Sequence, residues 1–502
     1  MPHRSSGASN SDSSNEAAAV NRPILRLYGL VALMFVLLVA FTSRWTVFEA
    51  ASLRKNPLNA RRVLEQERIQ RGSILAADGS VLARSLRGAE GAYERTYPTG
   101  EQFAAPIGYS FVASVGSTGL ELYRDADLNG QNATSLQSIL DQLQGKEQRG
   151  DRVLTTLDPR AQQVANAALA GHVGAVVALE PRSGALTVMA SSPSYDPNML
   201  RTRAGRAQLA REASTTPPTR SEVNRATQFG YAPGSTFKVV TATAAIDSGT
   251  YSPESTVSGR NNVPVSGVPL QNDENQSFGA ITLTEALAHS VNTVWAQVAE
   301  RVGKPTMARY MDRFGFGRKP QLDYPAEEMS KSGEYLGPLL ISPTSPQVDV
   351  GRMGIGQDKL EVVPLQMAEV AAAVANGGTL MVPHMTRRIV DPEGRTVRTI
   401  APRVQAVVMK RSTATAVTSM MEAVVREGTG TTAQIPGVQV AGKTGTAQTQ
   451  FGNAINDAWF IAFAPAADPK VAVAVTLKAV PGQGATFAAP VARAVIEQLL
   501  HD

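Results

Sequence analysis

The sequence predicts an α/β fold of the α+β type, with a five-stranded, mostly antiparallel sheet flanked by helices. Two observations predict the sheet: apolar runs rich in strand-forming residues come early, at 174–179 and 185–190, and late, at 438–446, 458–463 and 471–477. The third observation is that the long segment between these groups has mostly helical patterning. The sheet therefore closes only when the C-terminus returns, and the middle of the chain is not an independent domain.

The bulk composition sets the size of the protein and excludes several function classes. With 502 residues, 43% of them hydrophobic, the chain can form two or three domains with a large core. The formal charge of +5 is small, and no basic cluster interleaved with aromatic residues indicates nucleic-acid binding. The absence of cysteine excludes disulfides, thiolate zinc sites and a thiol nucleophile. The histidines are scattered without ligand spacing, so we expect no metal and no cofactor.

The N-terminal region predicts a single membrane anchor. Residues 1–23 are polar and rich in Ser, Asn and Ala, which predicts a disordered cytoplasmic tail. Residues 24–45 contain the apolar run Leu27–Ser43, near the short end of what crosses a bilayer. A buried core helix is disfavoured, whereas a cleaved signal peptide stays open because Val39-Ala40 offers small residues near the end. Long domains after an anchor translocate largely regardless of charge, so we place the rest of this single-pass protein outside the cytoplasm, at the cell membrane.

Residues 56–150 are expected to form a smaller N-terminal domain without obvious chemistry. The stretch 72–83 has two apolar arms around Asp78-Gly79, which is typical of a β-hairpin. The segment 116–121 predicts a turn that leads into a helix. We interpret this region as a pedestal or interaction module.

Residues 152–502 have the composition of a compact domain that holds the sheet. Its first helix is expected to begin at Pro159, with Asp158 as the N-cap. Residues 201–224 are polar and Arg-rich, and a long excursion of this kind often borders a cleft. The last helix, 488–500, has apolar residues at helical spacing.

The stretch 231–238 carries the strongest chemical signal. A Pro-Gly pair interrupts the chain, Ser235 follows where a helix should begin, and Lys238 lies three residues on, on the same helical face. A serine hydroxyl needs an adjacent base to become a nucleophile. Lysine serves only if its pKa falls from about 10.4 towards roughly 7–8, which burial and a second cation would cause. The alternative is a simple N-cap, and the spacing alone is weak because Ser52 and Lys55 repeat it.

A second polar cluster, Ser290 and Asn292, lies at the junction between two apolar helices. The first of these helices opens with a capping-box pattern at Thr282 and Glu285. Because the two residues are alternate in sequence, their side chains are expected on the same side. The alternative is that both only cap the second helix.

A third cluster, Lys443, Thr444 and Gly445, ends a predicted strand. Glycine at this point permits the close approach of another backbone. One alternative is a sheet-edge lysine that prevents aggregation. Another is a phosphate loop, because Gly437 and Gly442 give its letter pattern, but no long apolar helix follows.

These clusters, in this order, resemble the three motifs of the serine β-lactamase and penicillin-binding protein superfamily. Further matches narrow the resemblance to class B, monofunctional penicillin-binding proteins, and the short pre-catalytic region is most like that of the penicillin-binding protein A group of actinobacteria. An Asp-Arg pair usually follows R-G-x-I in this class, whereas this chain reads Leu75-Ala-Ala-Asp-Gly79, so the usual pedestal contacts are not carried over. The further matches are Arg71-Gly-x-Ile74, Gly116-x-x-Gly-Leu-Glu121, Asn224-Arg-Ala, Tyr231-x-Pro-Gly-Ser-Thr-Phe-Lys, Gly354-Ile-Gly-Gln357, Pro364-Leu-Gln-Met367, Gly428-Thr-Gly430 and Ala458-Trp-Phe460.

The resemblance implies a peptidoglycan D,D-transpeptidase, a serine-type acyltransferase that β-lactam antibiotics inhibit covalently. Ser235 would attack the carbonyl between the two terminal D-alanines of a peptidoglycan stem peptide, and Lys238 would take its proton. Ser290 would relay a proton to the leaving amine, and Lys443 would help to hold this proton network. Asn292 would hydrogen-bond the substrate amide.

The resemblance also implies how substrate binds. Thr444, Gly445 and Thr446 would bind the donor, the threonines through its carboxylate. The backbone N–H groups of Ser235 and Thr446 would form the oxyanion hole. An amine of a neighbouring stem peptide would then resolve the acyl-enzyme and give a cross-link.

The region ahead of the catalytic domain is too short for a glycan-polymerising domain as well. A separate glycosyltransferase or polymerase partner is therefore expected, in a division or elongation complex. Two alternatives stay open: a D,D-carboxypeptidase or β-lactamase, in which water resolves the acyl-enzyme, and a non-catalytic β-lactam sensor or scaffold.

Overall fold

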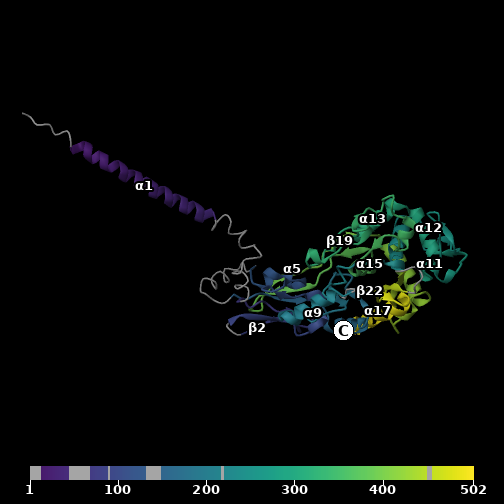
Figure 1. The fold of residues 1–502 in the computed structure, drawn as a ribbon. Helices are drawn as coiled ribbons and strands as arrows, with labels where there is room; N and C mark the ends of the chain where they lie inside the picture. The colour runs from purple at the N-terminus through teal and green to yellow at the C-terminus, as the bar shows by residue number, and fades with distance from the viewer. Residues whose placement is uncertain are drawn as a thin grey trace, which may run out of the picture. The chain divides into compact units, whose positions relative to one another are not determined.

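A computed structural model describes most of the chain, and Figure 1 labels its elements. The chain divides into two compact units, Met1–Gln66 and Glu67–Asp502. Ser52 and Lys55, which repeat the serine-lysine spacing, lie outside the described residues. The described residues are 13–44, 68–88, 91–131, 148–215, 220–448 and 455–501.

The first unit contributes one long helix, α1 (Ser13–Ser43). Its part Ile24–Ser43 is a mostly apolar stretch of 20 residues, none of them buried, and is long enough to cross a membrane, since a helix of this length rises about 30 Å. The helix begins earlier than predicted, so residues 13–23 of the expected disordered tail are helical. The Ala-rich run Glu16–Val20 explains the difference, because alanine has the highest helix propensity.

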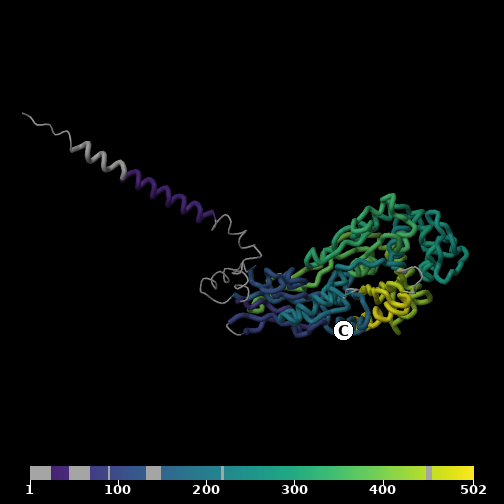
Figure 2. The backbone as a smooth tube through the Cα atoms, viewed as in Figure 1, coloured from purple at the N-terminus to yellow at the C-terminus, as the bar shows by residue number. Residues whose placement is uncertain are grey.

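The second unit begins with a six-stranded sheet built from two distant parts of the chain. The predicted hairpin is confirmed, since Asp78 Oδ1 accepts the N–H of Ser80 at 2.8 Å and Gly79 has a φ of +87°. Two strands from 386–399 join this sheet, so it crosses the boundary predicted near residue 151 (Figure 2). In spatial order the strands are β18 (Thr396–Thr399), β17 (Thr386–Val390), β6 (Arg152–Thr155), β1 (Ile74–Leu75), β2 (Val81–Arg87) and β3 (Tyr93–Thr96).

A buried charge cluster ties this sheet to the short helix α5 (Gly119–Tyr123). Glu121 is fully buried, and its carboxylate oxygens accept hydrogen bonds from Arg71 Nε at 2.7 Å and Arg95 Nε at 2.6 Å. Burial alone would raise the pKa of Glu121, but the two guanidinium groups hold it below its usual value. The predicted turn into a helix is confirmed. The cluster thus gives Arg71 and Glu121 a structural role in this part of the chain.

The predicted five-stranded sheet is present, and all of its strand pairs are antiparallel. Along β7, Ala175 and Val177 face one hydrophobic core, and Val176 and Ala178 face a second one. This alternation is the pattern of a strand covered on both faces. In spatial order the strands are β20 (Ala441–Gln448), β21 (Asn456–Ala464), β22 (Val471–Val480), β7 (Val173–Leu179) and β8 (Leu186–Ser192).

Helices cover the two faces of this sheet from different parts of the chain (Figure 1). As predicted, helices of the middle segment lie on one side, where α10 (Lys238–Asp247) and α15 (Pro364–Ala375) join the first core. On the other side α8 (Pro159–Leu169) and α17 (Gly484–His501) join the second core. Asp158 caps α8 as predicted, since its Oδ1 accepts the N–H of Ala161 at 2.8 Å.

The excursion at 201–224 differs from the prediction in two respects. It contains a regular helix, α9 (Arg203–Ala213), whose N-cap Thr202 accepts the N–H of Gly205 at 3.0 Å. Its end, residues 220–224, does border a cavity, but this cavity is separate from the one that Ser235 lines.

Helix α15 is apolar and buried but carries one acid, Glu369, whose exposed fraction is 2%. Its Oε1 has no hydrogen-bond partner, and its Oε2 lies 3.5 Å from Nε2 of Gln366. Burial raises the pKa of Glu369 to about 8. The carboxyl is therefore mostly protonated at neutral pH.

The substitution Glu369→Gln is expected to change how stability depends on pH. From the usual carboxyl pKa of 4.5 up to about 8, folded wild-type protein keeps a proton that the unfolded chain releases. Wild-type stability therefore falls as pH rises through this window, by about 5 kcal/mol in all. Glutamine does not titrate, so the unfolding free energy of Glu369→Gln relative to wild type should increase between pH 5 and pH 8.5. Urea unfolding measures this, and a difference that does not vary with pH would contradict it.

Candidate active site

Ser235 lies where the chain turns into helix α10. It belongs to a short 3-10 helix, η5 (Gly234–Phe237), that continues directly into α10. Gly234 has a φ of +53°, and its N–H donates to the carbonyl of Gly356 at 3.0 Å. The turn leaves Ser235 half-buried, at the wall of a cavity of about 450 Å³.

Lys238 is fully buried beneath this cavity and contacts the second polar cluster. Its Nζ donates to the carbonyl of Ser290 at 2.7 Å and to Oδ1 of Asn292 at 2.7 Å, and lies 3.2 Å from Oγ of Ser290. Ser235 and Lys238 share one turn as predicted, but no hydrogen bond joins their side chains in the described structure. A neutral amine that donates to the two carbonyl oxygens keeps one lone pair for a hydroxyl.

Ser290 and Asn292 stand between the helices α11 (Leu283–Ala288) and α12 (Asn292–Val302). The predicted capping box is present on α11. Neither residue caps α12, whose N-cap position is Val291 and lacks a side-chain hydrogen bond, so the capping alternative is wrong. Ser290 has a φ of +55°, which is strained for a residue other than glycine. Backbone strain of this kind clusters at functional sites.

Lys443 approaches the same point from strand β20. Its Nζ donates to Oγ of Ser290 at 2.9 Å and to the carbonyl of Thr444 at 2.9 Å. Although β20 is an edge strand, Lys443 is fully buried, which excludes a lysine exposed to prevent aggregation. The strand runs on to Gln448 and no helix begins at Lys443, which excludes a phosphate loop.

Burial makes both lysines lose their proton more readily than an exposed lysine, and at Lys238 the charge of Lys443 adds to this effect. Burial, and then the charge of Lys443, lowers the pKa of Lys238 well below its usual value, while Asp273 opposes the shift. Burial lowers the pKa of Lys443 to about 7. The two causes that the sequence required for a lysine base are thus present. The hydroxyl of Ser290 lies between the two amino groups and can pass a proton from one to the other.

The residues after Lys443 form the wall that faces Ser235. A side chain at Gly445 would lie 2.7 Å from the carbonyl oxygen of Pro233, so the predicted close approach is confirmed. Oγ1 of Thr444 lies 2.6 Å from Oγ1 of Thr429. Thr446 lines the cavity together with Ser235 and Thr444. The cavity therefore presents the hydroxyl groups of Thr429, Thr444 and Thr446 beside Ser235, and Oγ1 of Thr444 also lies 3.3 Å from Nζ of Lys443.

Several residues of this cavity were not singled out as site residues from the sequence. Thr429 and Gln357 belong to sequence patterns that match the family, and this match was the available signal for them. Nothing in the sequence indicated that they lie at the cavity of Ser235. Asp273 and Gln483 have no such signal, and Nε2 of Gln483 donates to Oδ2 of Asp273 at 2.9 Å. The other lining residues beyond the predicted set are Pro269, Leu270, Gln271, Asn272, Glu274, Asn275, His289, Arg352 and Ala485.

Two family patterns match most of the second unit. Residues 174–497 match the penicillin binding protein transpeptidase domain, and residues 71–153 match the penicillin binding protein A dimerisation domain. The chain belongs to the penicillin-binding protein transpeptidase family. The fold class and the family resemblance drawn from the three motifs are both confirmed.

Named relatives and solved structures agree with this family. The chain is similar to peptidoglycan D,D-transpeptidase PbpA of Mycolicibacterium smegmatis, with 35% identity over 96% of this chain and 100% of that protein. The PbpA of Mycobacterium tuberculosis is 34% identical over 96% of this chain and 99% of that protein. A penicillin G acyl-enzyme complex of penicillin-binding protein A from M. tuberculosis matches with a TM-score of 0.76 and 33% identity, covering 86% of this chain and 99% of that one.

Proposed function

We propose that this penicillin-binding protein is a peptidoglycan D,D-transpeptidase that works through an acyl-serine intermediate. One observation carries the proposal: Ser235, at a helix start, lines the same cavity as Ser290, whose hydroxyl contacts two buried, deprotonation-prone lysines. The names of the relatives, which are peptidoglycan D,D-transpeptidases, support the same reaction.

Acylation begins at Ser235. Its Oγ attacks the carbonyl carbon between the terminal D-alanines, and its proton goes to the neutral amine of Lys238. The carbon–nitrogen bond then breaks, and the leaving D-alanine takes a proton through Ser290, which Lys443 supports. Asn292 holds Lys238 by its Oδ1 and offers its amide to the substrate.

The oxyanion that develops on the substrate carbonyl also needs hydrogen-bond donors. The N–H of Ser235 lies in the first turn of η5, where N–H groups lack intrahelical acceptors. We assign it, with the N–H of Thr446, to the oxyanion hole, each donor worth about 2.7–4 kcal/mol. Thr444 and Thr446 bind the donor carboxylate, and Gly445 keeps their strand close to the serine turn.

An amine of a second stem peptide completes the cycle. Its nitrogen attacks the acyl carbon and loses a proton to Lys238, Ser235 leaves with a proton, and a cross-link forms. A β-lactam acylates the same serine without a leaving group that departs. The glycan strand that carries the acceptor peptide must be made by a separate polymerase. We expect this polymerase as a partner in a division or elongation complex.

The two units have different roles in this proposal. The helix Ile24–Ser43 anchors the protein in the cell membrane as a single span, with a short cytoplasmic tail before it. The catalytic unit then lies outside the cytoplasm, where peptidoglycan is. Residues 56–150 act as a pedestal or interaction domain, and the transpeptidase domain comprises 152–502.

The test is a cross-linking assay with the full chain in detergent. A stem pentapeptide ending in D-Ala-D-Ala is incubated with an amine acceptor, and mass spectrometry follows the products beside Ser235→Ala. We expect a cross-linked peptide and free D-alanine from wild type only. A trimmed tetrapeptide without cross-link would favour the carboxypeptidase alternative, and no product from either chain would favour the sensor or scaffold.

The rate of acylation by penicillin should rise with pH. Acylation needs a neutral Lys238 as base and a Lys443 that can take a proton from Ser290, and burial brings the pKa of Lys443 to about 7, so this amine is already protonated at lower pH. We therefore expect the acylation rate constant to drop about tenfold or more from pH 8 to pH 5.5 and to level off above pH 8. Stopped-flow fluorescence with a labelled penicillin measures it. A rate that is constant over this range would contradict the lysine base.

A further inference from the structure

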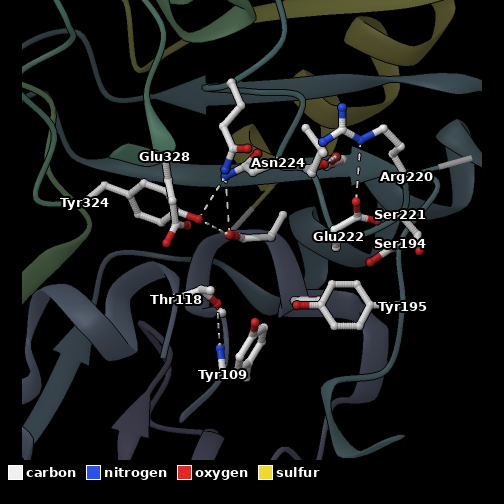
Figure 3. Close-up of a pocket in the computed structure, with 16 residues that line it drawn as sticks. Tyr109, Thr118, Ser194, Tyr195, Arg220, Ser221, Glu222, Asn224, Tyr324 and Glu328 are labelled. Carbon is white, nitrogen blue, oxygen red and sulfur yellow. Dashed lines mark hydrogen bonds and ion pairs between the residues drawn. The ribbon is translucent and has the colours of Figure 1, made fainter. Parts of the chain in front are cut away.

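A second cavity, of about 250 Å³, lies where the N-terminal sheet region meets the catalytic domain. Figure 3 shows its walls: the loop around Tyr109 and Thr118, the segment 220–228, and the pair Tyr324 and Glu328. It shares no lining residue with the cavity of Ser235. Its chemistry is therefore independent of the proposed reaction site.

Two carboxylates line this cavity with little compensation. Both oxygens of Glu328 lie 3.1 Å from the backbone nitrogen of Gly119, its side chain also interacts with the hydroxyl of Tyr324, and no lysine or arginine of the described residues pairs with it. Burial raises the pKa of Glu328, which is what a carboxylate without a cationic partner experiences. Glu222 has one oxygen 3.5 Å from Nε of Arg220, while its Oε2 is buried without a hydrogen-bond partner.

A buried tyrosine adds a second, independent observation. Tyr195 has an exposed fraction of 8%, and its hydroxyl makes no hydrogen bond with the described part of the chain. Figure 3 shows this hydroxyl directed into the cavity. Tyr324, by contrast, donates to the carbonyl of Ala105 at 2.6 Å and accepts from Nδ2 of Asn224 at 3.2 Å. The hydroxyl of a tyrosine this deeply buried, open to the cavity and without a partner among the described residues, needs a ligand or water to complete its hydrogen bonds.

The free groups of the cavity are acceptors of hydrogen bonds. The oxygens of Glu222, Glu328 and Tyr195 can all accept, and an alkylammonium carries three donors and no acceptor. The rings of Tyr109 and Tyr195 add faces that attract a cation. The cation in the wall is Arg220, which is 57% exposed and already near Glu222. An anion in the cavity would therefore be repelled by two carboxylates and attracted by only one arginine.

We propose that this cavity binds a primary alkylammonium group, held between Glu222 and Glu328 and by the hydroxyl of Tyr195. The volume equals about eight water molecules at roughly 30 Å³ each, which suits an amine on a short alkyl chain. Two sources have this chemistry: the lysine-like side chain of a peptide and a free diamine. The site adjoins the segment that leads to Ser235, because Oγ1 of Thr227 donates to the carbonyl of Glu328 at 2.8 Å.

The test titrates the full chain in detergent, followed by ligand-observed NMR. The probes are Nα-acetyl-lysine amide, its Nε-acetylated form with the same chain but no charge, and 1,5-diaminopentane. We expect the charged peptide mimic to bind and the acetylated form to bind at least tenfold more weakly. Tighter binding of the diamine than of the mimic would assign the site to free diamines, and the reverse to peptides. Benzylpenicillin pretreatment, which occupies the catalytic cavity of an acylated chain, should leave this binding unchanged.

Matched variants locate the binding. Glu328→Gln and Glu222→Gln should each raise the dissociation constant about tenfold or more, and Tyr195→Phe, which removes one oxygen, about threefold or more. Glu327→Gln removes an exposed acid next to Glu328 and should change it less than about twofold. Equal binding of charged and acetylated probes, no binding to wild type, or an equal effect of Glu327→Gln would overturn the proposal. Thermal unfolding midpoints exclude misfolded variants, and Tyr195→Phe remains informative if an acid variant does not fold.

Discussion

The substitution Lys238→Met is expected to slow acylation of Ser235 by benzylpenicillin about 10²–10⁴-fold, the usual contribution of a general base. Methionine has a similar length but cannot take a proton. Lys238→Arg should fail as well, because a guanidinium stays protonated in proteins. Stopped-flow acylation of the full chain in detergent measures both variants.

The control for Lys238 is Lys470→Met. Lys470 is an exposed lysine that pairs with Asp468 at 2.7 Å, directly precedes β22 and is not among the residues that line the cavity. Its loss should leave the acylation rate within about twofold, since exposed ion pairs contribute little. If Lys238→Arg acylated at the wild-type rate, proton transfer to Lys238 would be refuted. The role of Lys238 would then be limited to holding Ser290 and Asn292.

The substitution Gly356→Ala is expected to damage the site without touching any reactive group. The new Cβ would lie 1.9 Å from the carbonyl oxygen of Gly234, and Gly356 has a φ of +77°. The turn that carries Ser235 must then shift, and a displacement of about 1 Å at a reacting group costs about 10²-fold in rate. We expect at least this loss in acylation, together with a lower unfolding midpoint.

Gly317→Ala separates the two causes of damage. Gly317 has a φ of +81°, but a Cβ there would meet nothing within 4 Å. It should therefore show only the backbone cost, about 1–3 kcal/mol of stability, and keep a wild-type acylation rate. Equal loss of activity in both variants would contradict the specific contact between Gly356 and Gly234.

The sheet and the separate polar clusters could be predicted because local patterns determine them. The apolar runs of β7, β8, β21 and β22 alternate or persist as strands do, and Asp158-Pro159 is a local helix start. The serine and lysine motifs are short, and their order identifies the family. The expectation that Lys238 needs a second cation follows from pKa chemistry alone, and Lys443 supplies it.

What could not be predicted depends on contacts between distant segments. β17 joins the N-terminal sheet by pairing with β6, and neither segment carries a sequence pattern that predicts this pairing. The positive φ of Ser290 arises from the fold around it, since serine has no preference for that conformation. Asp273 reaches the cavity through a loop whose position Asn272 fixes, its Oδ1 accepting the N–H of Thr293 at 3.0 Å. The cavity that we propose binds an alkylammonium likewise forms only when the segments that carry Glu222 and Glu328 come together.

The most direct measurement is the intact mass of the full chain after incubation with benzylpenicillin, for wild type and Ser235→Ala. We predict one stable penicillin adduct on wild type, located by peptide mapping to the segment 231–238, and no adduct on the variant. Rapid penicillin hydrolysis without a lasting adduct would instead indicate a hydrolase. An adduct of equal yield on Ser235→Ala, or neither adduct nor hydrolysis with wild type, would contradict Ser235 as the nucleophile.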